Sequence, residues 1–298
     1  MKRVISKLGN LDRRIIFLLI GLAVLIPLIK PNWVQLPIKI DNNTQVVFES
    51  INKLKDGDKV LLSFAYGAST MPEVHPMAIA LLNHLFSKGV KVYIVSLWPE
   101  GPIMAQQAIT SVKESDIFDI EDGKNYIMFD YKVGGFVVIK GIADNFRELY
   151  KQDYNGKSIE ELSIMNDVYS VVDFDFVFDF SAGVPGNAEW VQYACDPKDV
   201  PLSSGCTSIM VTDAIPYVQS GQLKGILAGM PGAAEYEKLD FDYMINEKEM
   251  DNKYINPLVM INKGKAYSRM SAQSVAHLLM VIFIVIGNIA YYYSRKEN

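Results

Sequence analysis

The sequence predicts an α/β protein in which a doubly wound, mostly parallel sheet domain lies between an N-terminal and a C-terminal transmembrane helix. Two observations lead to this architecture. Short apolar runs alternate with segments of helical periodicity through the middle of the chain, as in strand–helix–strand units. Two longer apolar runs, one near each end, raise the mean hydropathy to +0.12, which is high for a soluble protein.

Composition excludes several function classes. The 298 residues include 34 acidic and 29 basic side chains, so the formal net charge of −5 offers no electrostatic footprint for a nucleic acid. Two cysteines exclude a disulfide-dense scaffold and a cysteine-rich zinc site. Neither GxxxxGK[ST] nor GxGxxG occurs, and the sequence predicts no cofactor.

The first apolar run covers residues 15–29 and contains no charge. It is shorter than the roughly 20 residues of a transmembrane helix, and its length overlaps that of a signal-peptide core. Lys30 can extend toward the headgroups, Trp33 lies where an interfacial aromatic belongs, and no small-residue cleavage site follows. We therefore expect residues 15–36 to form a retained anchor, with a cleaved leader as the alternative.

The second apolar run covers residues 275–293, and its 19 residues are enough to cross a bilayer. Tyrosines at its end and a basic tail, residues 294–298, are typical of a membrane interface. A buried core helix is the alternative, but the position at the end of the chain favours a span.

The distribution of basic residues predicts the topology. Five Lys or Arg residues lie in the tail of residues 1–14, and only Lys30 directly follows the first span. Because cytoplasmic segments carry the excess of Lys and Arg, we expect both tails in the cytoplasm and the middle of the chain outside it, in the cell (inner) membrane. That middle part divides into an α/β domain, residues 38–239, and a charged stalk, residues 240–272.

The clearest elements lie at the start of the middle domain. Residues 59–65 form a short apolar run typical of a strand buried on both faces, and residues 90–97 form a second one. Between them Pro72 suits an early helical position and predicts a helix over residues 72–87, with a further helix at residues 103–118. The first of these helices is expected to bury Val74, Met77, Ala78, Leu81, Leu82 and Leu85.

The alternation continues less regularly in the second half of the domain. We expect strands at residues 126–130, 136–139, 174–180, 208–211 and 223–227, and helices at residues 143–150 and 215–220. The segment 136–139 follows Gly134 and Gly135, and a helix start is its alternative. Strands joined through helices in this way are parallel, with right-handed crossovers.

Four stretches of the chain carry a resemblance. They are LLSFAYGASTMPEVHPMAIALLNHLFSKGVKVYIVSLWPEGP, VDFDFVFDFSAGVPGNAEW, PYVQSGQLKGILAGMPGAAEYE and AQSVAHLLMVIFIVIGN. In these stretches the chain resembles an uncharacterised family of bacterial and archaeal proteins with membrane-anchored α/β domains. The resemblance implies the architecture described above and brings no known activity with it.

Doubly wound sheets bind ligands beyond the carboxyl ends of their strands, where the strand order reverses. The ligand-crevice candidates in the corresponding loops are Tyr66, Ser69, Thr70, Glu73, His75, Trp98, Glu100 and Asp213. Gly183 and Gly186 belong to a turn whose free N–H groups are candidates for holding an anion. A tight turn that requires glycine is the alternative for this pair.

Catalysis at this crevice would depend on Glu73 and His75 as an acid–base pair. A spacing of two places their side chains on different faces of a helix, and a first-turn glutamate ordinarily complements the helix dipole. The nucleophile elbow GxSxG is absent from the chain. Catalytic residues therefore stay unassigned, and no catalysis is evident.

Cys195 and Cys206 enclose ten residues that we expect to form a loop rich in Pro, Ser and Gly. An oxidising compartment outside the cytoplasm would permit a disulfide between them. Two free buried thiols are the alternative, because sequence does not fix the Cα separation that a disulfide needs.

The sequence predicts no metal site. His75 and His84 lie nine residues apart, which places them on opposite sides of a helix. Asp173, Asp175 and Asp179 share the spacing of one strand face but lack the closing glutamate of an EF-hand loop. Solvated acidic edges are the favoured explanation of these aspartates.

The second apolar run contains polar residues that share a helical face. His277 and Asn288 lie eleven residues apart, close to three full turns, and Gln273 precedes His277 by one turn. Gly287 adjoins Asn288 and permits close backbone approach. Since polar groups in hydrocarbon usually face a partner helix, we expect a helix–helix contact here.

These observations leave three function classes. The favoured one is a binding or scaffold subunit of a membrane protein complex, held by two spans and contacting another transmembrane protein or a second copy through the second span. An extracytoplasmic hydrolase at the crevice around Glu73, His75, Glu100 and Asp213 is the first alternative. A small-solute receptor domain is the other, suggested by a likeness of PYVQSGQLKGILA to strings in periplasmic solute-binding proteins.

Overall fold

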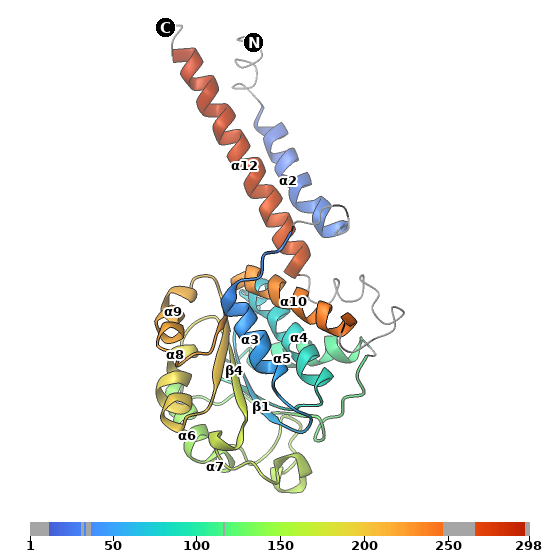
Figure 1. Ribbon diagram of the computed structural model, residues 1–298, viewed down its shortest axis with the longest axis vertical. Helices are drawn as coiled ribbons and strands as arrows, with labels where there is room; N and C mark the ends of the chain where they lie inside the picture. Colours follow the sequence, from blue (N-terminus) through green and yellow to red (C-terminus); the bar gives the residue numbers. More distant parts are fainter. Residues whose placement is uncertain (1–11, 31–32, 34–36, 116, 247–265, 296–298) are drawn as a thin grey trace. The chain divides into compact units, whose positions relative to one another are not determined.

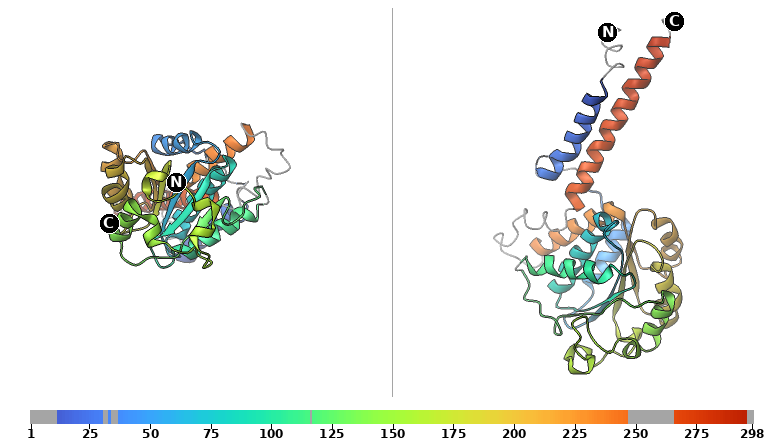
Figure 2. Two further views of the ribbon diagram at one scale, coloured as in Figure 1. Left: turned by 90° about the horizontal axis from the view of Figure 1, so that it is seen from below. Right: turned by 180° about the vertical axis from the view of Figure 1, so that it is seen from behind.

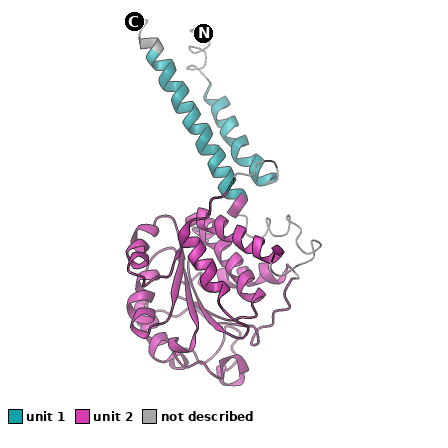
Figure 3. Ribbon diagram, in the orientation of Figure 1, with its two compact units in different colours: residues 1–37, 268–298 teal, residues 38–267 magenta. Residues whose placement is uncertain are grey.

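The computed structural model describes residues 12–30, 33, 37–115, 117–246 and 266–295 (Figure 1). The chain divides into two compact units (Figure 3). One comprises residues 1–37 and 268–298, and the other comprises residues 38–267. The larger unit is an α/β domain built on a six-stranded, all-parallel sheet with helices on both faces, as the sequence predicts.

The sheet has the strand order β3-β2-β1-β4-β5-β6. Its strands are β1 Lys59–Ala65, β2 Lys91–Ser96, β3 Tyr126–Met128, β4 Phe176–Ser181, β5 Leu202–Cys206 and β6 Ile226–Ala228. The chain builds outward from β1 in one direction and then returns to add β4 on its other side, so the order reverses between β1 and β4. This is the doubly wound arrangement, and it predicts a ligand crevice beyond the carboxyl ends of these two strands.

Helices cover the two faces of the sheet in separate groups (Figures 1 and 2). One face carries α3 Asn42–Asn52, α4 Met71–Ser87, α5 Gly101–Lys113 and α10 Gly229–Asn246. The other carries α6 Phe136–Asp144, α7 Phe146–Leu149, α8 Asn187–Trp190 and α9 Val211–Gln219, with the short turns η2 Ile159–Glu161, η3 Ser163–Met165, η4 Val171–Asp173, η5 Val191–Cys195 and η6 Asp196–Lys198. The turn η5 is a π-helix, whereas the other four are 3₁₀ turns.

The prediction for α4 is confirmed. The helix covers Met71–Ser87, with Pro72 in its first turn, and every residue of the predicted apolar face is buried. The strands on either side are buried along nearly their whole length, as expected for a parallel sheet covered on both faces. The predicted helix at residues 103–118 also forms, as α5, although it begins and ends slightly earlier.

Several predictions for the second half are wrong in position or type. Residues 136–139 are not a strand but begin α6, the alternative given for this segment, because Gly135, at φ 56°, ends the preceding loop and starts the helix. Residues 208–211 are a turn leading into α9, and the neighbouring strand is β5, whose small polar residues give no apolar signal. The strand expected at 223–227 forms later and shorter, as β6.

The predicted stalk, residues 240–272, is partly helical. Its first residues continue α10 to Asn246, and Asp240 is buried there instead of lying in an irregular segment. Its last residues belong to α12 Ala266–Arg295, and the segment between these helices lies outside the described residues. Helical periodicity at 240–246 is masked in the sequence by the high charge of the segment.

The smaller unit contains α2 Arg13–Ile29 and most of α12. Among the described residues, one helix is long and apolar enough to cross a membrane, and it covers the stretch Ala266–Tyr292. The N-terminal run is helical, as predicted, but α2 has 17 residues with Pro27 inside it and does not reach that length. The fold thus shows a single helix of spanning length in the described residues, where the sequence predicted two spans.

Candidate functional site

The predicted crevice residues lie in loops that follow the carboxyl ends of the strands. Tyr66 follows β1 directly, Trp98 and Glu100 follow β2, and the segment from Gly183 to Gly186 follows β4. Because all strands are parallel, these loops meet at one edge of the sheet, here called the carboxyl edge. Hydrogen bonds between the loops show how this edge is organised.

Glu100 joins the loop after β2 to the loop after β1. Its Oε2 accepts a hydrogen bond from the backbone N–H of Ala68, with 2.6 Å between the two atoms. Gly67 lies against the same carboxylate, and a Cβ at that position would overlap it. In dinucleotide-binding sheets this first strand–helix turn holds phosphate, but here the carboxylate of Glu100 occupies the donor.

Glu73 joins the first turn of α4 to the loop after β5. Its Oε2 accepts two hydrogen bonds from Ser208, from the backbone N–H and from the hydroxyl, each at 2.9 Å. His75 lies two residues further along α4, on a different face, and is buried, with its Nδ1 2.9 Å from the hydroxyl oxygen of Tyr66. Glu73 and His75 therefore interact with different partners, and their geometry is not that of an acid–base pair.

The turn after β4 is closed by its own contacts. The backbone N–H of Gly186 donates to Oε2 of Glu189 at 2.7 Å, which caps α8. A Cβ on Gly183 would lie 2.9 Å from the Trp98 ring, and a Cβ on Gly186 would lie 2.6 Å from the carbonyl oxygen of Gly183. Close packing accounts for both glycines, and the anion donor predicted at Gly186 is already bonded to a carboxylate.

The remaining crevice candidates lie at the surface of the same edge. Ser69 and Asp213 are exposed, and Thr70 donates a hydrogen bond from its hydroxyl to the carbonyl oxygen of Gly67 at 3.3 Å. Asp213 is in the first turn of α9, where a carboxylate complements the helix dipole. The structure thus gathers the predicted residues at one edge but gives Glu73, Glu100 and Glu189 the role of holding loops together.

Asp179 is a buried acid whose importance the sequence analysis missed. It lies on β4, fully buried, in register with Ser63 of β1 and on the same face as Ser181. The pKa of this carboxyl group is raised to about 7; burial is the main cause, Glu189 acts in the same direction, and the neighbouring hydroxyl groups of Ser63 and Ser181 act in the opposite direction. The alternating string FDFVFDF suggested a half-exposed strand, whereas this strand is covered on both faces.

The three aspartates predicted to form a solvated edge have separate roles. Asp175 accepts a hydrogen bond from the backbone N–H of Lys59, Asp173 caps the turn η4, and Asp179 is in the core. Within the described part of the chain, no group of three or more His, Cys, Asp or Glu residues is arranged to hold a metal ion. His84, on the opposite side of α4 from His75, lies with its Nδ1 2.9 Å from the Tyr236 hydroxyl.

Cys195 and Cys206 are buried free thiols, the second of the two possibilities that the sequence left open. The expected loop between them contains the strand β5, which carries Cys206 at its end, and the helical turn η5 carries Cys195. The pKa of both thiols is raised, that of Cys206 to about 12, mainly by burial and also by the nearby Asp179. Each thiol is therefore protonated at neutral pH and behaves as a small apolar group.

The polar residues of the second apolar run lie on α12. Gln273, His277, Gly287 and Asn288 are all exposed along this helix. No heavy atom lies within 4 Å of the position that a Cβ on Gly287 would occupy. The predicted contact surface is thus unoccupied by α2 at these positions.

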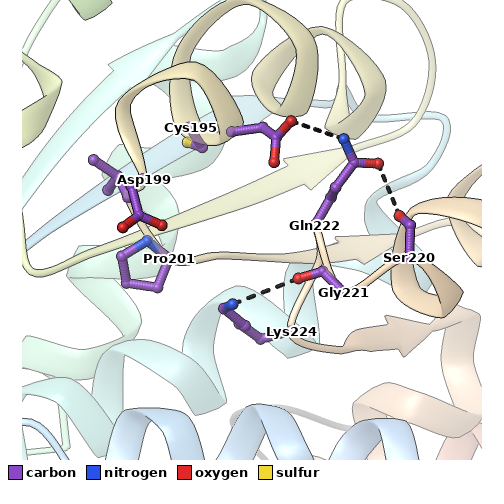
Figure 4. Close-up of a pocket in the computed structure, with 9 residues that line it drawn as sticks. Cys195, Asp199, Pro201, Ser220, Gly221, Gln222 and Lys224 are labelled. Carbon is purple, nitrogen blue, oxygen red and sulfur yellow. Dashed lines mark hydrogen bonds between the residues drawn. The ribbon is translucent and has the colours of Figure 1, made fainter.

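A separate pocket lies at the amino ends of β5 and β6, opposite the carboxyl edge (Figure 4). Its volume is about 330 Å³, and it is lined by the two segments that enter these strands. The lining residues are Cys195, Asp196, Asp199, Val200, Pro201, Ser220, Gly221, Gln222 and Lys224. The string PYVQSGQLKGILA, which suggested a small-solute receptor, contributes the second of the two segments that line this pocket.

Comparison of the chain with protein-family models, with curated proteins and with solved structures finds no match. The class that the structure defines is therefore a fold class: a six-stranded, doubly wound parallel α/β domain connected to a helix of membrane-spanning length. Any statement about function has to rest on the geometry of the chain itself.

Proposed function

We propose that the protein is a membrane-anchored binding or scaffold subunit, whose α/β domain lies outside the cytoplasm and acts without catalysis. The observation that carries this proposal is the use of the acids at the carboxyl edge. Glu73, Glu100 and Glu189 each accept hydrogen bonds from backbone N–H groups. These hydrogen bonds hold the loops of the edge in place. The carboxylates therefore do not face an open position for a substrate, as general acids or bases do. The hydrolase alternative is weakened by the same contacts.

The carboxyl edge also presents apolar side chains to solvent, two of them, Val184 and Ile209, in the loops that these glutamates hold. Val133 follows β3 and is 83% exposed, Val184 follows β4 and is 74% exposed, and Ile209 follows β5 and is 85% exposed. Val137, in the first turn of α6, is 60% exposed. Exposed apolar side chains on a pre-ordered edge favour contact with another protein, because little conformational entropy is lost on binding.

The membrane arrangement in this proposal has two spans, α2 and α12, with both tails in the cytoplasm. The helix α12 supplies the spanning length, and Arg13 and Arg14 at the start of α2 agree with a cytoplasmic N-terminus. The exposed polar stripe of α12 supports contact with a further transmembrane protein or with a second copy.

Site-specific photo-crosslinking in native membranes tests the proposal. A photoreactive residue in place of Val184 or Ile209 of the full-length protein is expected to yield a discrete larger product, the same from both positions. Lys55, exposed in the loop before β1 at the opposite edge, provides the matched control position and should yield none. Equal products from all three positions, or no product from Val184 and Ile209, would contradict a binding role for the carboxyl edge.

A further inference from the structure

The pocket at the amino ends of β5 and β6, here called the amino-edge pocket, combines opposite charges with an apolar floor. Its acidic members are Asp196 and Asp199, from the segment that enters β5, and its basic member is Lys224, from the segment that enters β6. Buried Val200 and Cys195, together with Pro201, supply the apolar part of the lining. Most of the lining is polar, and the placed polar groups of a small-molecule site fix the orientation of its ligand.

Asp199 and Lys224 do not form an ion pair with each other. Neither side chain takes part in a salt bridge within the described residues, whose four ion pairs involve other groups. Lys224 makes one long contact, 3.5 Å from its Nζ to the carbonyl oxygen of Gly221. Asp199 has a left-handed backbone, at φ 54°. Among the described residues it is the only one other than glycine with a positive φ. Both charged groups are thus available to a ligand.

Gln222 lies in the pocket wall between two hydrogen-bond partners, as Figure 4 shows. Its Nε2 donates to Oδ2 of Asp196 at 2.9 Å, and its Oε1 accepts from the hydroxyl of Ser220 at 2.8 Å. The bond to Asp196 connects the segment entering β5 to the segment entering β6, and the bond from Ser220 orients the Gln222 amide within its own segment. The two segments that carry Asp199 and Lys224 are therefore joined before any ligand arrives, which lowers the entropic cost of binding.

We propose that the amino-edge pocket binds a free α-amino acid, with its ammonium group at Asp199 and its carboxylate at Lys224. The apolar floor formed by Val200 and Pro201 accommodates the aliphatic part of the ligand side chain. Two aspartates against one lysine leave the lining with a net charge of −1, so amino acids with a cationic side chain bind most tightly, with Asp196 facing the second positive charge.

This site is independent of the binding role proposed for the carboxyl edge, because it lies at the other end of the strands and shares no residue with that edge. It adds a small-molecule ligand to a domain proposed to contact protein.

Isothermal titration of the full-length protein in detergent micelles tests the proposal. L-lysine is expected to bind more tightly than L-alanine, whereas n-butylamine and butyrate, which carry one charge each, produce no measurable heat. Asp199→Asn removes the negative charge while keeping a residue that tolerates the left-handed backbone. This variant and Lys224→Gln should each raise the Kd for L-lysine by at least about tenfold, since each leaves one ligand charge unpaired.

Two charge-matched variants away from the pocket serve as controls. Asp119→Asn and Lys140→Gln change exposed residues and should leave the Kd for L-lysine within about twofold of that of the unmodified protein. The proposal is overturned if neither amino acid binds at about 10 mM, if n-butylamine binds as tightly as L-lysine, or if all four variants share one Kd. None of these results bears on the photo-crosslinking outcome at Val184 and Ile209, so the two proposals fail separately.

Discussion

Asp179 shows how a single residue can oppose the stability of the sheet that contains it. Its carboxyl group is fully buried at the centre of β4, where a charge loses its hydration and gains no basic partner among the causes that shift its pKa. The protonated form is therefore favoured, and the pKa rises to about 7. Ser63 and Ser181 provide hydroxyl groups beside it, so the neutral acid is accommodated without an ion pair.

The free energy of unfolding should consequently fall as the pH rises from about 4 to about 7. Below this window Asp179 is protonated in both states; within it the unfolded chain, with an ordinary pKa of 3.8, releases the proton while the folded protein retains it. The shift corresponds to about 4 kcal/mol, fully present at low pH and lost as the pH reaches 7. Urea denaturation of the full-length protein at a series of pH values measures this slope.

Asp179→Asn provides the comparison, because the amide has the shape of the acid and does not titrate. Burial also raises the pKa of Asp240 in α10, which adds to the slope with the same sign in both proteins. The difference between the two slopes therefore reports Asp179 alone. Identical slopes between pH 4 and pH 7 would show that Asp179 does not carry the proton in the folded state.

At the scale of elements, α4 covers one face of the sheet with its buried apolar side chains. Leu81 is completely buried in its middle, on the predicted apolar face. Leu81→Ala should lower the free energy of unfolding by roughly 2–5 kcal/mol, through lost burial and the cavity that remains. Ile103→Ala on α5, where the side chain is 53% exposed, is the matched control and should cost less than about 1 kcal/mol. Comparable losses from both variants in urea denaturation would mean that the core is placed wrongly.

The elements that sequence predicted well are those with an unbroken apolar signal. The strands β1 and β2 and the helix between them have long apolar runs with a clear period, and the structure reproduces them closely. The strand β5 lacks that signal, because its sequence LSSGC consists mainly of small polar residues. Its burial follows from its position between β4 and β6, which is a property of the whole sheet.

The candidate site shows the same limit. The loops of the carboxyl edge were predictable, because they follow directly from recognising strands and helices in parallel order. The hydrogen bonds that Ala68 donates to Glu100 and Ser208 donates to Glu73 were not predictable, since they join residues 32 and 135 positions apart. The amino-edge pocket likewise combines two segments separated by a full helix, and no local motif marks such a juxtaposition.

At the scale of the whole molecule, the two ends of the parallel sheet have different chemistry. The carboxyl edge has carboxylates bound to backbone donors and exposed apolar tips, which suits a stable surface for another protein. The amino edge has unpaired charges around a polar pocket, which suits a small ligand. A doubly wound sheet ordinarily binds its ligand at the carboxyl edge, so filling that edge with internal hydrogen bonds leaves the amino edge as the place for a small molecule.

The helix α12 provides a further surface beside the two edges of the sheet. Its polar stripe predicts that it contacts another helix and does not serve only as an anchor. Asn288 is exposed on α12, and within hydrocarbon its amide would be satisfied only by another helix or by trapped water. Interhelical hydrogen bonds of this kind contribute about 0.6 kcal/mol on average, so Asn288→Leu should weaken assembly modestly. Replacing residues 275–293 by polyleucine should weaken it further, because the small and polar contacts are all removed. Native mass spectrometry in mild detergent measures the assembly, and the thermal unfolding of the α/β domain should stay unchanged in both variants. If the polyleucine protein keeps the same oligomeric state and every copurifying partner, α12 serves only as an anchor, and the binding role has to rest on the carboxyl edge alone.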